Sequence, residues 1–230
     1  MPKISFVMPS YEKGAFIARA IESVREQTLK DWELIVVDDC STDGTQELLK
    51  YYRKLDERIK PYYREKNYGV DPARNLGSKI ASANLLLVLD ADDWADKKRA
   101  RITYDHFQKH PDTDLFYGSF MAADIRVKHL IMCCAEKFTK ESLERTGFFG
   151  ICHSTVAYPK RIWEQYPYIG DHDKGNGGEW DLYWRLYKDG AKFRFTTSVL
   201  GAYRCGESAL KDFEKREKLL AKKRKKMGLE

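Results

Sequence analysis

The first half of the chain alternates short apolar runs with segments in which apolar residues recur every three or four positions. Four runs have the length and composition of buried strands: ISFVM (4–8), ELIVV (33–37), IKPYY (59–63) and LLLVL (85–89). Three segments between them place their apolar residues on one side of a helix: 14–28, 43–57 and 72–83. Apolar strands separated by helices are typical of a parallel sheet that is covered on both faces. We therefore predict an open, mostly parallel α/β sheet, Rossmann-like, for residues 1–110.

The second half of the chain follows a less regular pattern. Its predicted elements are a β-prone stretch at 113–132, helices near 160–166 and 179–190, and a strand or two at 192–203. A length of 230 residues suits one domain of the larger kind. We therefore expect residues 1–110 and a smaller β/α portion at 111–206 to be two halves of one domain, followed by a helix or tail at 207–230.

The composition is that of a globular chain, with 43% hydrophobic and 13% aromatic residues. No apolar run approaches the roughly 20 residues that span a bilayer, and the apolar stretch at the N-terminus is too short for a signal peptide. The five cysteines lack a Cys-x-x-Cys spacing, which argues against a zinc site or a disulfide framework. We expect a protein of the reducing cytoplasm.

The basic charge of the chain is concentrated in its tail. Of the formal net charge of +6, residues 211–230 contribute nine Lys or Arg and four Asp or Glu, so the rest of the chain is close to neutral. A nucleic-acid-binding module needs basic charge spread over its surface, so we expect no specific nucleic acid partner. Residues 207–230 can form a basic amphipathic helix that contacts an anionic membrane face peripherally, although a solvated terminal helix is the simpler interpretation.

Polar and acidic residues follow three of the predicted strands. The three motifs, in chain order, are Pro9-Ser10-Tyr11, Asp38-Asp39 and Asp90-Ala91-Asp92-Asp93. In an open α/β sheet these strand ends meet at one edge, where five carboxylates repel one another unless a cation compensates. Oxygen ligands of this kind suit Mg²⁺ or Mn²⁺ bound together with substrate phosphates. Asp92 or Asp93 alone could equally cap a helix that begins near Asp96, but two clusters favour a metal or nucleotide site.

These motifs also carry a resemblance to a known family. Residues 7–45, VMPSYEKGAFIARAIESVREQTLKDWELIVVDDCSTDGT, and 67–93, NYGVDPARNLGSKIASANLLLVLDADD, resemble the nucleotide-sugar-binding half of the inverting family-2 glycosyltransferases of the GT-A fold. The similarity continues more loosely through GICHSTVAYPKRIWEQ, GGEWDLYWRLYKDG and YRCGES. It implies a GT-A domain with a donor half at 1–110 and an acceptor and catalytic half at 111–206.

The resemblance assigns donor-site roles by position. Asp92, the last residue of the Asp-x-Asp motif, would bind the metal directly, and Asp90 would contact the ribose or the surroundings of the metal. Asp38 and Asp39 would read the uracil or ribose, and Arg74 the base or the phosphates, although a solvated helix arginine is the simpler interpretation of Arg74 alone. The other residues expected to line the nucleotide are Pro9, Ser10, Tyr11 and Ala91.

The resemblance also implies a general base, with a departure from the family pattern. Family members usually have Glu-Asp at the start of the helix that here reads GGEWDLYWRL, whereas this chain has Gly178-Glu179. Glu179 would then be the base, with Asp181 as the alternative, unless both acids only favour the helix N-terminus. His153 and Arg204 are weaker candidates, because a lone histidine is more often structural and Cys205-Gly206 stands where the family often has a histidine.

We therefore expect a metal-dependent inverting hexosyl- or hexosaminyltransferase. Its donor would be a nucleotide sugar, with UDP favoured by the resemblance, and its acceptor a hydroxyl of a glycan, a lipid-linked glycan or another molecule. A sugar-phosphate nucleotidyltransferase is the alternative enzyme, but PSYEKGAF lacks the expected Gly-rich loop. A phosphohydrolase of the haloacid-dehalogenase type would need Thr or Val after the Asp-x-Asp motif, where Asp93 stands. A nucleic-acid or membrane-surface module would depend on the tail.

Overall fold

The computed structural model describes residues 1–124, 129–139, 151–169 and 178–205. Its elements run in the order β1 (Ile4–Ser10), α1 (Ile17–Arg25), β2 (Trp32–Asp38), α2 (Thr45–Leu55), β3 (Ile59–Tyr63), α3 (Val70–Ile80), β4 (Leu85–Val88), β5 (Trp94–Ala95), α4 (Arg99–Lys109), β6 (Leu115–Asp124), β7 (His129–Cys133), the short 3-10 helix η1 (His153–Thr155), β8 (Ala157–Pro159), α6 (Lys160–Gln165), α7 (Gly178–Lys188) and β9 (Phe193–Cys205). Among these described residues, no helix has both the length and the apolar character needed to cross a membrane.

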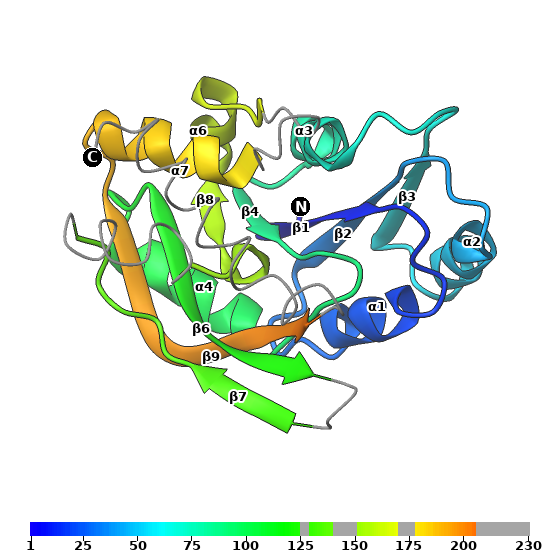
Figure 1. Ribbon diagram of the computed structural model, residues 1–230, viewed down its shortest axis with the longest axis horizontal. Helices are drawn as coiled ribbons and strands as arrows, with labels where there is room; N and C mark the ends of the chain where they lie inside the picture. The colour runs from blue at the N-terminus through cyan, green and yellow to red at the C-terminus, as the bar shows by residue number, and fades with distance from the viewer. Residues whose placement is uncertain (125–128, 140–150, 170–177, 206–230) are drawn as a thin grey trace, which may run out of the picture.

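One sheet runs through both halves of the chain (Figure 1), in the order β3-β2-β1-β4-β8-β6-β9-β5 with β7 paired to β6. Strands β3, β2, β1 and β4 are parallel, which confirms the α/β sheet predicted for the first half. Beyond β4 the pairing is mixed, because β8 runs antiparallel to β4 and β6 runs parallel to β9. Strand β5 pairs with β9, so the end of the chain's first half is tied to the last described strand.

Alternating side chains of the parallel strands build two separate cores. In β4, Leu85 and Leu87 pack on one face with α1, α2 and α4, while Leu86 and Val88 pack on the other face with α3, α6 and α7. Figure 1 shows α3, α6 and α7 together on one side of the sheet. Because both faces are covered, the central strands β1, β2 and β4 are mostly apolar, which is the pattern seen in the sequence.

Helix α4 is missing from the helices predicted by apolar periodicity. Its buried face includes Arg99 and Thr103, which interrupt the apolar stripe. The Arg99 guanidinium lies inside the fold and donates to the carbonyl oxygens of Val88 and Val156, at 2.6 and 3.3 Å. Polar residues therefore occupy positions of the buried face at which an amphipathic helix normally has apolar residues.

The interpretation of Asp92 or Asp93 as the cap of this helix is wrong. The residue before α4 is Lys98, and no side chain caps the helix there. Instead, Asp96 accepts the hydrogen bonds of the backbone at the start of α4. Its carboxylate accepts from the Lys98 N–H at 2.8 Å, and its carbonyl oxygen accepts from the Arg99 N–H at 2.9 Å. The aspartates of the Asp-x-Asp motif are not engaged in starting α4.

One buried carboxylate, that of Glu33, lies near the amino ends of β1 and β2, at the opposite end of the strands from Asp38 and Asp39. Glu33 is 2% exposed and accepts hydrogen bonds from Ser5 and Ser82, with the Lys60 ammonium 2.6 Å away. Burial raises the pKa of Glu33, but the hydrogen bonds from Lys60, Ser5 and Ser82 outweigh it and lower the pKa to about 2. The charged carboxylate therefore stabilises the junction of β1, β2 and the segment after α3.

We predict that Glu33→Gln lowers the free energy of unfolding by about 3 kcal/mol at neutral pH. This value follows from the difference between the folded-state pKa of about 2 and the ordinary glutamate pKa of 4.5. Because the folded-state pKa is depressed, this stability is present above pH 4.5 and lost as the pH falls toward 2. Urea unfolding of wild type and variant between pH 7 and pH 2 measures it, and the two curves should converge in acid. The exposed Glu57→Gln serves as control; a constant difference at every pH would contradict the prediction.

Candidate active site

The carboxyl ends of the parallel strands meet at one edge of the sheet, as predicted. Ser10 pairs with Asp38 across β1 and β2, and the Asp39 N–H donates to the Ser10 carbonyl at 2.8 Å. Strand β4 ends beside β1 and leads directly into Asp90. At this edge Ser10 is buried, whereas the Tyr11 side chain is 46% exposed.

Asp38 and Asp39 are both buried, and each carboxylate holds a neighbouring loop in place at this edge of the sheet. Asp38 accepts from the Ser41 hydroxyl at 2.6 Å and from the Gln46 amide at 2.9 Å, which fixes the turn into α2. Asp39 accepts from the N–H groups of Tyr68 and Gly69, at 2.9 and 2.6 Å, and pairs with the Arg64 guanidinium at 3.0 Å. The carboxylate of Asp39 thus holds the segment that leads into α3 against the end of β2.

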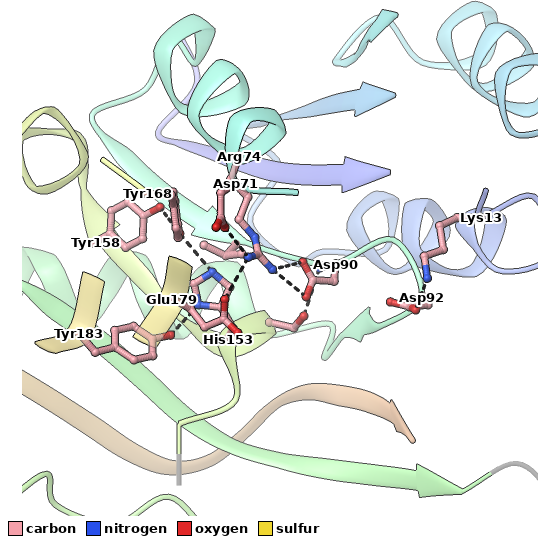
Figure 2. A network of polar contacts seen from close by, with 12 residues as sticks. Lys13, Asp71, Arg74, Asp90, Asp92, His153, Tyr158, Tyr168, Glu179 and Tyr183 are labelled. Carbon is pink, nitrogen blue, oxygen red and sulfur yellow. Dashed lines mark hydrogen bonds and ion pairs between the residues drawn. The ribbon is translucent and has the colours of Figure 1, made fainter. Parts of the chain in front are cut away.

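Arg74 is the centre of a polar network that joins both halves of the chain (Figure 2). Its Nη2 lies 3.0 and 3.2 Å from the two carboxylate oxygens of Asp90, and its Nη1 lies 3.3 Å from Asp71 and 3.4 Å from Glu179. The side chain is 6% exposed, so its interpretation as a solvated helix arginine is wrong. Burial lowers the pKa of Arg74, but Asp90 and Glu179 raise it well above its ordinary value, so the guanidinium stays charged.

Glu179, at the start of α7, is the acidic residue of that helix that reaches Arg74. Burial raises the pKa of Glu179, but the positive charge of Arg74 and smaller favourable contributions together outweigh burial, so the pKa is lowered and the carboxylate is ionised at neutral pH. Asp181 instead forms an ion pair within α7, with 2.6 Å between its carboxylate and Arg185 Nε. The geometry therefore favours Glu179 over Asp181 as the acidic group of the site.

His153 is held by neutral hydroxyl groups. Its Nδ1 lies 2.5 Å from the Tyr183 hydroxyl and its Nε2 lies 3.1 Å from the Tyr168 hydroxyl, which in turn contacts the Tyr158 hydroxyl at 2.7 Å. Burial lowers the pKa of His153 well below its ordinary value, and the charge of Arg74 adds to the effect. The uncharged imidazole ties η1 to α7, which supports the structural interpretation of this histidine.

The three aspartates after β4 have three different environments. Asp90 faces Arg74, and Asp92 pairs with the Lys13 ammonium at 2.6 Å. Asp93 is 1% exposed and accepts from the Arg204 N–H at 2.9 Å; burial, with the charge of Asp90 nearby, raises the pKa of Asp93 to about 8. Repulsion within this motif is therefore reduced by two counter-cations, Arg74 and Lys13, and by burial, which favours the neutral form of Asp93.

Arg204 does not point freely toward the edge of the sheet. Its guanidinium stacks on the Phe16 ring, 3.4 Å from the ring centroid, and its N–H anchors Asp93. Two other features named in the sequence lie outside the described residues: Gly206 and the basic tail at 207–230.

The donor set of the Asp-x-Asp motif fits a hard divalent cation. Asp90 and Asp92 offer carboxylate oxygens on side chains that are 29% and 31% exposed, and the Lys13 ammonium shows that the Asp92 position favours a positive charge. In the described ranges, no group of three or more His, Cys, Asp or Glu side chains could hold a metal ion. One or two carboxylates completed by phosphate oxygens is the arrangement that Mg²⁺ takes in nucleotide sites, so the two residues suit such an ion.

Two site residues, Asp71 and Lys13, are absent from the sequence-based candidates. Asp71 is three residues before Arg74 in α3, a spacing at which side chains of a helix can pair, so this signal was available. Lys13 approaches Asp92 from a loop 79 residues earlier in the chain, and no local pattern indicates that contact.

Comparison with known proteins identifies the family. A model described as "Glycosyl transferase family 2" matches residues 5–164. The putative teichuronic acid biosynthesis glycosyltransferase TuaG of Bacillus subtilis is 38% identical over 124 residues, which are 54% of this chain and 49% of that protein. An uncharacterized glycosyltransferase of Methanocaldococcus jannaschii is 27% identical over 207 residues, 88% of this chain and 71% of that protein. The chain spans half or less of the first curated relatives that it matches.

Solved structures share the fold. Staphylococcus aureus TarS, residues 1–349 in complex with UDP-GlcNAc, superposes with a TM-score of 0.72 at 17% identity, covering 89% of this chain and 59% of that chain. Mannosyltransferase PcManGT from Pyrobaculum calidifontis, in complex with GDP-Man and Mn²⁺, gives a TM-score of 0.67 at 13% identity, covering 90% of this chain and 58% of that chain. The sheet and helices described above are those of the GT-A fold, and the chain belongs to glycosyl transferase family 2.

Proposed function

We propose that this transferase moves a hexosyl or hexosaminyl residue, with inversion and with the help of a divalent metal, from a nucleotide sugar to an acceptor hydroxyl. The observation that carries the proposal is the single guanidinium of Arg74, which joins Asp90 of the Asp-x-Asp motif to Glu179 of α7. A UDP-sugar is the favoured donor, supported by the UDP-GlcNAc complex of TarS; the GDP-Man complex of PcManGT keeps a second nucleotide open.

The donor is proposed to bind along the carboxyl ends of β1, β2 and β4. Pro9, Ser10 and Tyr11 would line the nucleotide from β1, Asp38 and Asp39 from β2, and Ala91 from the turn after β4. Asp92, with Asp90, would hold Mn²⁺ or Mg²⁺, which supplies positive charge against the diphosphate when bound. Lys13 and Arg74 add fixed positive charge on either side of the motif, where a diphosphate needs it.

Glu179 is proposed as the general base. Its carboxylate would accept the proton of the acceptor hydroxyl as the acceptor oxygen forms a bond to the anomeric carbon. On the opposite side of that carbon, the bond to the diphosphate oxygen would break, and its electron pair would leave with the nucleoside diphosphate. The ion pair with Arg74 keeps Glu179 ionised, so the base is ready at neutral pH without a prior proton loss.

The acceptor is proposed to be a hydroxyl of a glycan, free or lipid-linked. TuaG is named for teichuronic acid biosynthesis, which supports a polysaccharide acceptor, but the chain covers only 49% of that protein. Residues from 111 onward would form the acceptor side, because Glu179 and the helix that carries it lie there. Contact of the tail with a membrane stays a prediction.

We predict that UDP or another nucleoside diphosphate binds only in the presence of Mn²⁺ or Mg²⁺, and that Asp92→Asn lowers its affinity by about tenfold or more. The variant keeps the shape of the side chain and removes the charge that the metal needs. Calorimetric titration of UDP, GDP and CMP, with and without metal, measures both effects. Asp105→Asn, on the far helix α4, is the matched control; failure of the wild type to bind any of the three nucleotides would refute the donor site.

We predict that Glu179→Gln lowers kcat by about 10²–10⁴-fold, because the base is lost. The nucleotide affinity should stay close to that of wild type, because Arg74 keeps its ion pairs with Asp71 and Asp90. Release of UDP from UDP-GlcNAc, with water or an added glycan as acceptor, measures kcat. The wild-type rate should fall in acid only below the ordinary pKa of a glutamate, since Arg74 lowers the pKa of Glu179. Asp181→Asn is the control on the same helix; equal losses in both variants would reject Glu179 as the base.

A further inference from the structure

Asp71 is a buried carboxylate for which the proposed mechanism has no role. It lies in the first turn of α3, is 1% exposed, and places Oδ1 at 3.3 Å from Arg74 Nη1. Figure 2 shows it next to the Arg74 guanidinium, on the network that reaches Glu179. An acidic residue in the first turn of a helix also interacts favourably with the helix dipole, so its presence there alone does not explain what it does.

The residue that faces Asp71 is Gly178, at the start of α7. A Cβ atom added at Gly178 would lie 2.3 Å from Asp71 Oδ2 and 2.5 Å from its Cγ, closer than real Cβ contacts come. A side chain at position 178 would therefore require the buried carboxylate of Asp71 to move.

The start of α7 therefore presents the carboxylate of Glu179 to Arg74, while the position before it is a glycine packed against Asp71. We propose that Asp71 is a positioning residue for Glu179: it acts through Arg74 and occupies the place that a side chain at 178 would need. The inference rests on the proposed role of Glu179 and deepens it.

We propose that Asp71 competes with Glu179 for the hydrogen bonds of one Arg74 nitrogen, Nη1. Nη2 serves Asp90, and Nη1 is shared between Asp71 and Glu179. Without Asp71, Nη1 would pair with Glu179 alone and draw its carboxylate toward α3, away from the acceptor. A shift of the base by about 1 Å can cost about a hundredfold in rate, whereas the Asp90 side of Arg74 would be unchanged.

A reciprocal exchange tests the proposal. The proteins are wild type, Asp71→Ala, Gly178→Glu, the double variant, Asp71→Asn as a variant that keeps the shape, and Asp105→Ala as an exposed control. Each is measured for its thermal unfolding midpoint and for kcat and KM of UDP release from UDP-GlcNAc and of GDP release from GDP-mannose. The double variant places a carboxylate at 178 and removes the one that blocks it.

We expect Asp71→Ala and Asp71→Asn to lose about 10- to 100-fold in kcat with little change in KM. Gly178→Glu should be the least stable protein, because its side chain meets Asp71. The double variant should unfold at a higher temperature than Gly178→Glu and recover at least about tenfold in kcat over Asp71→Ala. A helix-dipole role for Asp71 would predict no such rescue.

The outcomes separate the two hypotheses. Wild-type kcat in Asp71→Asn, or a double variant no better than the single variants, would overturn the positioning role. If wild type releases neither nucleotide from either donor, the proposed function fails instead. The unfolding midpoints then still decide whether side chains at positions 71 and 178 compete for the same space. If the change in midpoint of the double variant equals the sum of the changes in Asp71→Ala and Gly178→Glu, that part of the inference is overturned.

Discussion

The arrangement of the site depends on the buried positive charge of Arg74, which needs carboxylates around it to remain ionised away from water. The Arg74 guanidinium is removed from water and is kept ionised by carboxylates from three places: α3 itself, the end of β4 and the start of α7. A buried ion pair is stable only when its geometry satisfies the hydrogen-bonding groups on both sides. Arg74 therefore requires α7 to lie where Glu179 can reach it, and so it links the first half of the chain to the helix α7 of the second half.

The fold was predictable where the sequence patterns are local. The runs at 33–37 and 85–89 became β2 and β4, because strands covered on both faces are apolar at most positions. Apolar periodicity did not indicate helix α4, because its buried face carries Arg99, which donates to the carbonyl oxygens of Val88 and Val156. A buried polar group held by tertiary contacts gives no periodic signal.

The candidate site was predictable in its residues and less so in its contacts. Strand ends placed Asp38, Asp39 and Asp90 at one edge, as sheet topology requires. The pairing of Asp92 with Lys13 joins residues 79 positions apart, and no spacing rule reaches that far. The resemblance put Glu179 ahead of Asp181, but the sequence did not indicate their contacts: Glu179 pairs with Arg74 and Asp181 with Arg185.

The hydroxyl chain around His153 has a consequence for how the site responds to its surroundings. Tyr158, Tyr168, His153 and Tyr183 connect β8 to α7 through groups that are neutral at physiological pH. Such contacts are not weakened by counter-ion screening, unlike pairs of exposed charges. The position of α7 relative to β8 therefore depends in part on contacts that salt does not screen, beside the buried ion pair of Glu179 with Arg74.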